Sequence, residues 1–316
     1  MRVLSIDGGG IRGLIPAIVL TDIERRTGRR IAELFDLVAG TSTGGILACA
    51  LTAPSTEDPA VPRLSAEELA GLYETEGPKI FSRSLLKRLV SLEGFVDERY
   101  DDAGLHGALD RFLGPTRLRD ALTPLFVTAY DIAECSAFFF RSARAVEDPA
   151  FDFAMVDVAR ATSAAPTYFE PVEVAPAAGG RRRALIDGGV FATNPAMCAY
   201  ADIVRAGRAS ELVVSLGTGQ HTRPLTFGTV RGWGQLEWAR PIIDVVFDGV
   251  ADTVDFQLGQ LLADGDYIRL QTELNVASDD LDDASPENLE RLRQEAATII
   301  HTRDADIEAL CARLVR

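Results

Sequence analysis

The pattern of apolar and polar residues at the start of the chain predicts two strand-turn-helix units. Residues 2–6 form a short apolar run typical of a buried strand, and residues 14–25 carry the apolar spacing of a helix. Residues 35–39 are again strand-like, and residues 46–51 form an apolar helix of small residues. The start of the chain therefore predicts a βαβα arrangement, which is typical of an α/β fold.

The remainder of the chain predicts further strands and helices, without an internal repeat or a clear linker. Ser65 and Glu68 have the spacing of a capping box, which opens a helix running to Glu76. We expect a helix at 102–112, a hairpin of strands at 125–130 and 137–140, strands at 184–186, 212–216 and 267–272, and a helical period after Ser285-Pro286. The prediction is a catalytic domain over residues 1–275 and a helical C-terminal extension over 276–316, with the acidic run 279–283 as a solvated connection.

Composition and charge narrow the class of protein. The chain has 316 residues, of which 47% are hydrophobic and 25% charged, as in ordinary folded proteins. Its net charge of −15 repels phosphate backbones, so no nucleic acid polymer is expected as a partner. The four cysteines lie far apart, which argues against a zinc site and a disulfide framework. Neither a signal-peptide core nor a run of ~20 apolar residues is present, so we expect a cytoplasmic protein.

A glycine-rich turn joins the first predicted strand to its helix. Residues 7–13 read Asp-Gly-Gly-Gly-Ile-Arg-Gly, and glycine lets backbone amides approach a negatively charged oxygen at a helix start. Gly8, Gly10 and Gly13 also match Gly-x-Gly-x-x-Gly, which serves dinucleotides when an acidic residue ends the second strand. Here the second strand ends in Ala-Gly-Thr-Ser instead, which argues against a dinucleotide site.

The second turn carries a candidate nucleophile. Residues 40–45 read Gly-Thr-Ser-Thr-Gly-Gly, so Gly40 and Gly44 frame Ser42 at a strand-to-helix turn. Such a turn exposes the serine Oγ at the head of the helix, and the backbone N–H of the next residue, Thr43, faces the same space. A helix N-cap serine is the simpler interpretation, but an N-cap does not need glycine on both sides.

A serine hydroxyl needs a proton acceptor, and the sequence offers two. Asp187 ends a short apolar strand and is followed by Gly188 and Gly189, so its carboxylate can project into a cleft. His221 follows Ser-Leu-Gly-Thr-Gly-Gln, and the order Ser42, Asp187, His221 is that of α/β-hydrolase triads. An isolated Asp-Gly is also common as a hairpin turn.

Taken together, these motifs resemble the patatin family of lipid acyl hydrolases. Three further stretches resemble the same family: residues 161–169, Ala-Thr-Ser-Ala-Ala-Pro-Thr-Tyr-Phe; Asn194-Pro195, after the aspartate; and Ser-Leu-Gly-Thr-Gly at 215–219. The resemblance implies a three-layer α/β/α fold with a mainly parallel central sheet, and a Ser-Asp dyad of Ser42 and Asp187. It also implies an oxyanion hole, with roles carried over to Gly8, Gly9, Gly10 and Arg12.

The implied reaction is hydrolysis of a lipid ester through an acyl-enzyme, without metal or cofactor. With its ordinary pKa of about 3.9, an aspartate is a weak base towards a hydroxyl, so much of the rate must come from the oxyanion hole. Two alternatives remain open: an esterase with a Ser-His-Asp triad that uses His221, and a non-catalytic protein that binds an anionic ligand in the same loops.

A basic amphipathic stretch suggests how a lipid substrate is reached. Residues 79–92 carry Lys79, Arg83, Lys87 and Arg88 between apolar residues and contain no acid, a pattern that can rest on an anionic bilayer. A helix packed on the core is the commoner interpretation. Similar bacterial proteins include phospholipases activated by cyclic oligonucleotides in phage defence, so the resemblance leaves such an activator and a homo-oligomer open.

Overall fold

The computed structural model describes residues 1–80, 102–220, 225–238 and 241–316. Within them, eight strands form one sheet in the order β5-β6-β3-β2-β1-β7-β8, with β4 paired to β3. The strands are β1 (Arg2–Ile6), β2 (Leu37–Gly40), β3 (Leu125–Asp131), β4 (Ser136–Arg141), β5 (Val172–Val174), β6 (Arg183–Asp187), β7 (Leu212–Leu216) and β8 (Tyr267–Leu270). The pairs that join β3, β2, β1, β7 and β8 are parallel, whereas those of β4, β5 and β6 are antiparallel.

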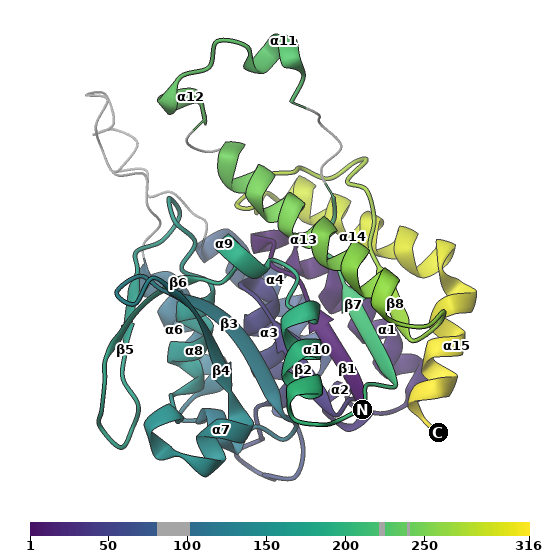
Figure 1. Ribbon diagram of the computed structural model, residues 1–316. Helices are drawn as coiled ribbons and strands as arrows, with labels where there is room; N and C mark the ends of the chain where they lie inside the picture. The colour runs from purple at the N-terminus through teal and green to yellow at the C-terminus, as the bar shows by residue number, and fades with distance from the viewer. Residues whose placement is uncertain (81–101, 221–224, 239–240) are drawn as a thin grey trace.

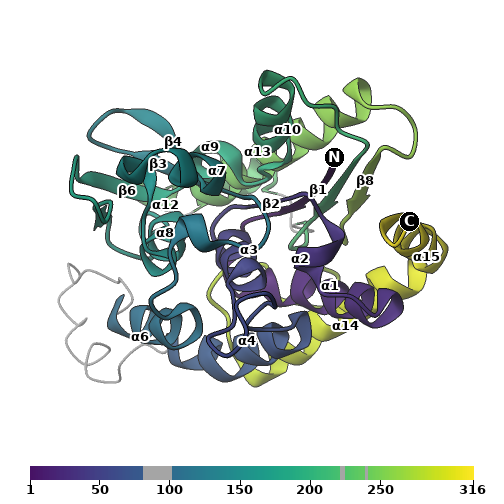
Figure 2. The ribbon, with the colours of Figure 1, turned by 90° about the horizontal axis from the view of Figure 1, so that it is seen from below.

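Helices cover both faces of this sheet, as Figures 1 and 2 show. One face carries α10 and α13, and the other carries α1, α3, α4 and α14. The α-helices of the described residues are α1 (Leu14–Thr27), α2 (Ile31–Leu34), α3 (Thr43–Thr52), α4 (Ala66–Ile80), α6 (Asp102–Leu113), α7 (Ser142–Glu147), α8 (Met155–Thr162), α9 (Gly189–Ala192), α10 (Ala196–Arg205), α11 (Phe227–Val230), α12 (Gln235–Trp238), α13 (Pro241–Leu261), α14 (Pro286–Thr302) and α15 (Asp304–Leu314). The predicted three-layer α/β/α fold is confirmed.

Alternation along the strands explains why two layers of helix are needed. In β1, Val3 packs in the apolar cluster beneath α10 and α13, whereas Leu4 and Ile6 point into the larger cluster on the opposite face. Both faces of a parallel sheet must be buried in this way. The apolar stripe of α14 and α15, with Leu292 and Leu310 among its members, joins the larger cluster.

Most predicted elements are confirmed, with shifted ends. The hairpin of β3 and β4 is present, and the capping box is complete, since the Ser65 amide donates to Glu68 Oε2 at 2.7 Å and the Glu68 amide to Ser65 Oγ at 3.1 Å. Helix α3 begins at Thr43, three residues before the predicted start, so the turn that carries Ser42 is tighter than the sequence suggested. The long helix α13 was not predicted.

The register of β3 brings two distant strand ends together. Phe126 pairs with both Ala39 of β2 and Arg141 of β4, while Ala129 pairs with both Asp187 of β6 and Phe138 of β4. Because β4 occupies one edge of β3 throughout, β2 and β6 must share the other edge. They run in opposite directions along it, so the end of β2 meets the end of β6.

Candidate active site

Ser42 lies at the point where β2 passes into α3. Its backbone has φ 54° and ψ −125°, a conformation that L-residues rarely adopt and that costs about 1–3 kcal/mol. Gly44 permits the sharp turn because a Cβ there would collide with the carbonyl of Ile6. The Ser42 amide donates to Thr162 Oγ1 at 2.9 Å, and the residue is 7% exposed. The fold therefore holds this serine in a strained position beside a pocket.

Asp187 ends β6 and is fully buried, with 0% exposure. Its Oδ1 accepts the Gly189 amide at 2.7 Å, whereas Oδ2 has no hydrogen bond of regular geometry within the described residues. Burial raises the pKa of Asp187 to about 7, although the Ser42 hydroxyl and the Gly189 amide each favour the charged carboxylate. The sequence-based expectation of an ordinary aspartate therefore underestimates its basicity.

One short segment positions both residues. Thr162, at the end of α8, accepts the Ser42 amide, and the Ala164 carbonyl accepts the Asp187 amide at 3.0 Å. Thr162 is completely buried. The family-like stretch 161–169 pointed to this region, but neither residue was singled out, because hydrogen bonds between distant segments leave no local pattern.

The glycine-rich loop after β1 faces Ser42. The amide of Gly8 is engaged, since it donates to the Thr193 carbonyl at 2.9 Å. The amides of Gly9 and Gly10 make no hydrogen bond within the described residues. Gly10 has φ 57°, and a Cβ at this position would collide with the Leu281 carbonyl, so glycine is required there. Of the three glycine amides that the sequence assigned to the oxyanion hole, those of Gly9 and Gly10 are therefore open to a ligand.

Side chains behind the loop fix where these amides point. Thr218 Oγ1 donates to the Gly8 carbonyl at 2.7 Å, and Arg12 donates to the Gly9 carbonyl through its amide at 3.1 Å and through Nε at 3.4 Å. In a planar trans peptide the C=O and the following N–H point in opposite directions. Holding these two carbonyls therefore turns the N–H groups of Gly9 and Gly10 away from Thr218 and Arg12.

Arg12 acts from behind the loop, and the C-terminal segment supports it. Its guanidinium also donates to the Asp279 carbonyl at 3.4 Å, while the Ile11 amide donates to the Leu281 carbonyl at 2.9 Å. Burial lowers the pKa of Arg12, which the carboxylate of Asp248 on α13 opposes most strongly. The prediction that 279–283 is only a solvated connection is wrong, because Leu281 is buried and this segment braces the loop.

A second buried carboxyl lies at the end of β1, where the glycine-rich loop begins. Asp7 follows β1 and pairs with Arg269 of β8, whose NH2 lies 2.6 Å from Asp7 Oδ2. Burial raises the pKa of Asp7 to about 6, against the opposing charge of Arg269. Asp7 Oδ1 has no hydrogen-bond partner within the described residues.

The pocket beside Ser42 is lined by four of the predicted site residues, Gly9, Gly10, Ser42 and Thr43, and not by Asp187. It holds about 520 Å³ of space free of protein atoms, open solvent at its mouth included. Its lining comprises Gly9, Gly10, Ser42, Thr43, Ile46, Leu105, Ser163, Ala165, Tyr168, Phe169, Phe247 and Leu281. Gly8 and Arg12 instead line a neighbouring polar pocket with Thr218 and Asp248. Among the remaining motif glycines, Gly13 lies against Thr43, Gly40 against the Gly44 backbone, and Gly188 against Thr128.

Several residues that the sequence singled out do not line the pocket at Ser42. His221, Arg83, Lys87 and Arg88 lie outside the described residues, and Lys79 pairs with Glu76 in the last turn of α4. Across the described ranges, no group of three or more His, Cys, Asp or Glu side chains is arranged to hold a metal ion. None of the helices described is long and apolar enough to cross a bilayer.

Comparison with known proteins identifies the family. The family model for patatin-like phospholipases matches residues 4–200. The chain belongs to the patatin-like phospholipase family. It is 37% identical to patatin-like protein 2 of Arabidopsis thaliana over 92% of this chain and 81% of that protein, and 34% identical to patatin-like protein 2 of Oryza sativa subsp. indica over 92% and 82%. The crystal structure of VipD from Legionella pneumophila matches 95% of this chain and 67% of the VipD chain, at 12% sequence identity and a TM-score of 0.40. Members of this family are lipid acyl hydrolases, so the family assignment supports an esterase or phospholipase.

Proposed function

We propose that the protein hydrolyses the carboxylic ester bonds of membrane lipids through Ser42 and Asp187. The observation that carries the proposal is the fully buried carboxyl of Asp187, whose charged form is favoured by the hydroxyl of a serine in a strained backbone conformation. Family membership alone does not make a chain active, since a 30% identical relative from Solanum tuberosum is named "Probable inactive patatin-3-Kuras 1". The site must therefore support the assignment.

The first half of the reaction forms an acyl-enzyme. Ser42 Oγ attacks the ester carbonyl carbon while its proton passes to Asp187, and the ester oxygen then leaves as an alcohol that takes this proton back. Accepting a proton neutralises a carboxylate that no water surrounds, so burial favours the transfer. In the second half, water attacks the acyl-enzyme by the same route and releases the free fatty acid.

The negative oxygen of each tetrahedral intermediate needs donors that are already in place. The amides of Gly9 and Gly10 are oriented by Thr218 and Arg12, and the amide of Thr43 belongs to the first turn of α3, where helix amides lack internal partners. One such donor is worth about 3–4 kcal/mol of transition-state stabilisation. We assign Arg12 and Thr218 as positioning residues, which act through the loop.

The test combines lipid hydrolysis with covalent labelling. Wild type, Ser42→Ala and the exposed-serine control Ser136→Ala are incubated with a mixed phospholipid and glyceride panel, and released fatty acid is measured by mass spectrometry. A fluorophosphonate probe should label wild type and Ser136→Ala but leave Ser42→Ala unmodified. Fatty acid release by Ser42→Ala at the wild-type rate would disprove the proposal.

Replacement of His221 distinguishes the Ser-Asp dyad from the Ser-His-Asp triad. The His221→Ala variant should hydrolyse the same panel at close to the wild-type rate, because Asp187 supplies the base. A collapse of hydrolysis in a folded His221→Ala protein would favour the triad.

Contact with an anionic bilayer through the basic segment remains a prediction. Charge reversal at Lys87 and Arg88 should weaken binding to anionic vesicles. Unchanged vesicle binding by the charge-reversed variant would show that this segment does not hold the protein on the bilayer.

A further inference from the structure

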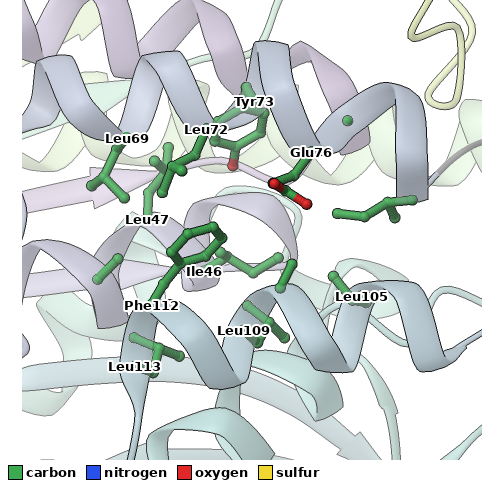
Figure 3. Close-up of a pocket in the computed structure, with 14 residues that line it drawn as sticks. Ile46, Leu47, Leu69, Leu72, Tyr73, Glu76, Leu105, Leu109, Phe112 and Leu113 are labelled. Atoms are coloured by element: carbon green, nitrogen blue, oxygen red, sulfur yellow. The ribbon is translucent and has the colours of Figure 1, made fainter.

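An apolar cavity lies between α3, α4 and α6, beside the candidate active site (Figure 3). It holds about 590 Å³ of space free of protein atoms, open solvent at its mouth included. The cavity and the pocket at Ser42 have separate linings apart from two shared residues.

Each of the three helices presents one apolar stripe to this cavity. The stripes have the i, i+3, i+4 spacing of a single helix face. They comprise Ile46, Leu47 and Ala50 of α3; Leu69, Leu72, Tyr73, Glu76, Gly77 and Ile80 of α4; and Leu105, Ala108, Leu109, Phe112 and Leu113 of α6. Figure 3 shows the labelled side chains of α4 and α6 facing one another across the space. The stripes face one another but do not fill the space.

Ile46 and Leu105 join the cavity to the pocket at Ser42, because both line the two spaces. Ile46 lies one turn of α3 beyond the serine. At the boundary, the Tyr73 hydroxyl bonds to Thr43 Oγ1 and, at 3.3 Å, to the Thr43 carbonyl, so its polar atom is satisfied on the catalytic side. The cavity therefore adjoins the pocket at Ser42, and both are lined mainly by apolar side chains.

The single charged residue in the described lining is Glu76, which is paired. It binds Lys79 at 2.9 Å and Arg111 of α6 at 2.7 Å, and these ion pairs lower the pKa of Glu76. The contact with Arg111 also ties α4 to α6. An open apolar cavity of this kind next to a candidate nucleophile suits the apolar part of a ligand.

We propose that this cavity receives the acyl chain of the lipid ester and sets the chain length that the enzyme prefers. This inference rests on the proposed function and adds the binding site for the acyl part of the substrate. Ala50, the last lining residue of α3, lies eight residues beyond Ser42, or ~12 Å along the helix at 1.5 Å per residue. An acyl chain whose carbonyl lies at Ser42 enters the cavity past Ile46 and Leu105 in this proposal.

Chain-length profiles test the proposal. Wild type should hydrolyse p-nitrophenyl esters with kcat/KM that rises with acyl length, by up to about fourfold for each buried methylene. Ala108→Phe fills the cavity from α6, so the ratio of kcat/KM for the C16 ester to that for the C4 ester should fall at least about tenfold. The same replacement at the exposed Ala133 should leave this ratio unchanged.

A second variant and a binding measurement cover the case in which Ala108→Phe does not fold. Leu109→Ala enlarges the cavity and should shift the preference towards longer chains. In the Ser42→Ala background, calorimetry should detect palmitate binding that Ala108→Phe weakens about tenfold or more.

The outcomes separate the two proposals. Unchanged C16 to C4 ratios in both folded cavity variants, with full hydrolysis, would overturn the acyl cavity and leave the proposed function standing. If wild type hydrolyses no ester but Ala108→Phe weakens palmitate binding, the result would support the cavity and count against the proposed function. Absence of palmitate binding together with absence of hydrolysis would overturn both.

Discussion

Two buried aspartates, Asp7 and Asp187, lie at the ends of β1 and β6 in the same sheet. The group that faces the carboxyl differs between them. Both are almost inaccessible, at 2% and 0% exposure, and burial raises the pKa of each, to about 6 and about 7. Asp7 faces the guanidinium of Arg269, whereas Asp187 faces the hydroxyl of Ser42. A carboxylate paired with a cation is held in its charged form, while one opposite a hydroxyl is able to take a proton. We propose that the neighbour, more than the burial, separates a structural role for Asp7 from a reactive role for Asp187.

Replacement of the reactive carboxyl should have the largest effect. In Asp187→Asn the proton acceptor is lost, so we expect kcat to fall by about 10⁴-fold, at the upper end for a general base. The free energy of unfolding at pH 8 should not decrease, because the variant removes a buried charge. Steady-state kinetics and urea denaturation measure the two effects. Strong destabilisation with residual activity near wild type would reverse the roles assigned to the two aspartates.

The structural carboxyl should show the opposite pattern. Asp7→Asn leaves the Arg269 charge buried without its partner, so the free energy of unfolding should fall by about 3 kcal/mol. The folded fraction should keep far more activity than Asp187→Asn. Urea denaturation and active-site titration with a fluorophosphonate measure stability and activity per folded molecule. An Asp7→Asn protein as stable as wild type would contradict this assignment.

The raised pKa of Asp187 predicts a pH profile. In the proposed mechanism the carboxylate is the base, so the rate should be constant above pH 7 and fall about tenfold for each pH unit below it. The stability effect has the opposite sign: the folded protein holds this proton more tightly than the unfolded chain, so the contribution of Asp187 to stability decreases as pH rises from about 4 to about 7. Comparison of wild type with Asp187→Asn isolates that contribution. A rate that stays level down to pH 5 would argue against this carboxyl as the base.

The smallest effect is expected behind the glycine-rich loop. Thr218→Val removes the hydrogen bond to the Gly8 carbonyl, and kcat should fall about tenfold, less than the ~10²–10³-fold cost of losing a donor outright. KM should change little, and Thr218→Ser should restore the rate. If Ser and Val at this position behave alike, the hydroxyl has no positioning role.

Local patterns predicted the elements that carry the site. The strand-turn-helix units around residues 7–13 and 40–45, the capping box at Ser65 and the start of α14 after Ser285 all depend on spacings of a few residues, which a sequence displays directly. Helix α13 was missed even though Asp244, Asp248 and Asp252 recur every fourth residue, because its valines favour strands locally.

The environment of the candidate site was beyond the reach of local patterns. The meeting of Ser42 with Asp187 follows from the register of β3, and the pKa of the aspartate follows from its burial. The family resemblance supplied that pairing before the register was known. The supports from Thr162, Thr218 and Leu281 are single hydrogen bonds between distant segments, which neither spacing nor composition reveals.

The contact between Ile11 and Leu281 makes two segments that lie far apart in the chain depend on each other. The loop that faces the serine is shaped in part by a carbonyl that is synthesised long after the loop itself. A nascent chain that has already folded β1, β2 and β6 still lacks this brace. Full activity is therefore expected only after the segment around Leu281 has docked, however early the strands that carry the site form.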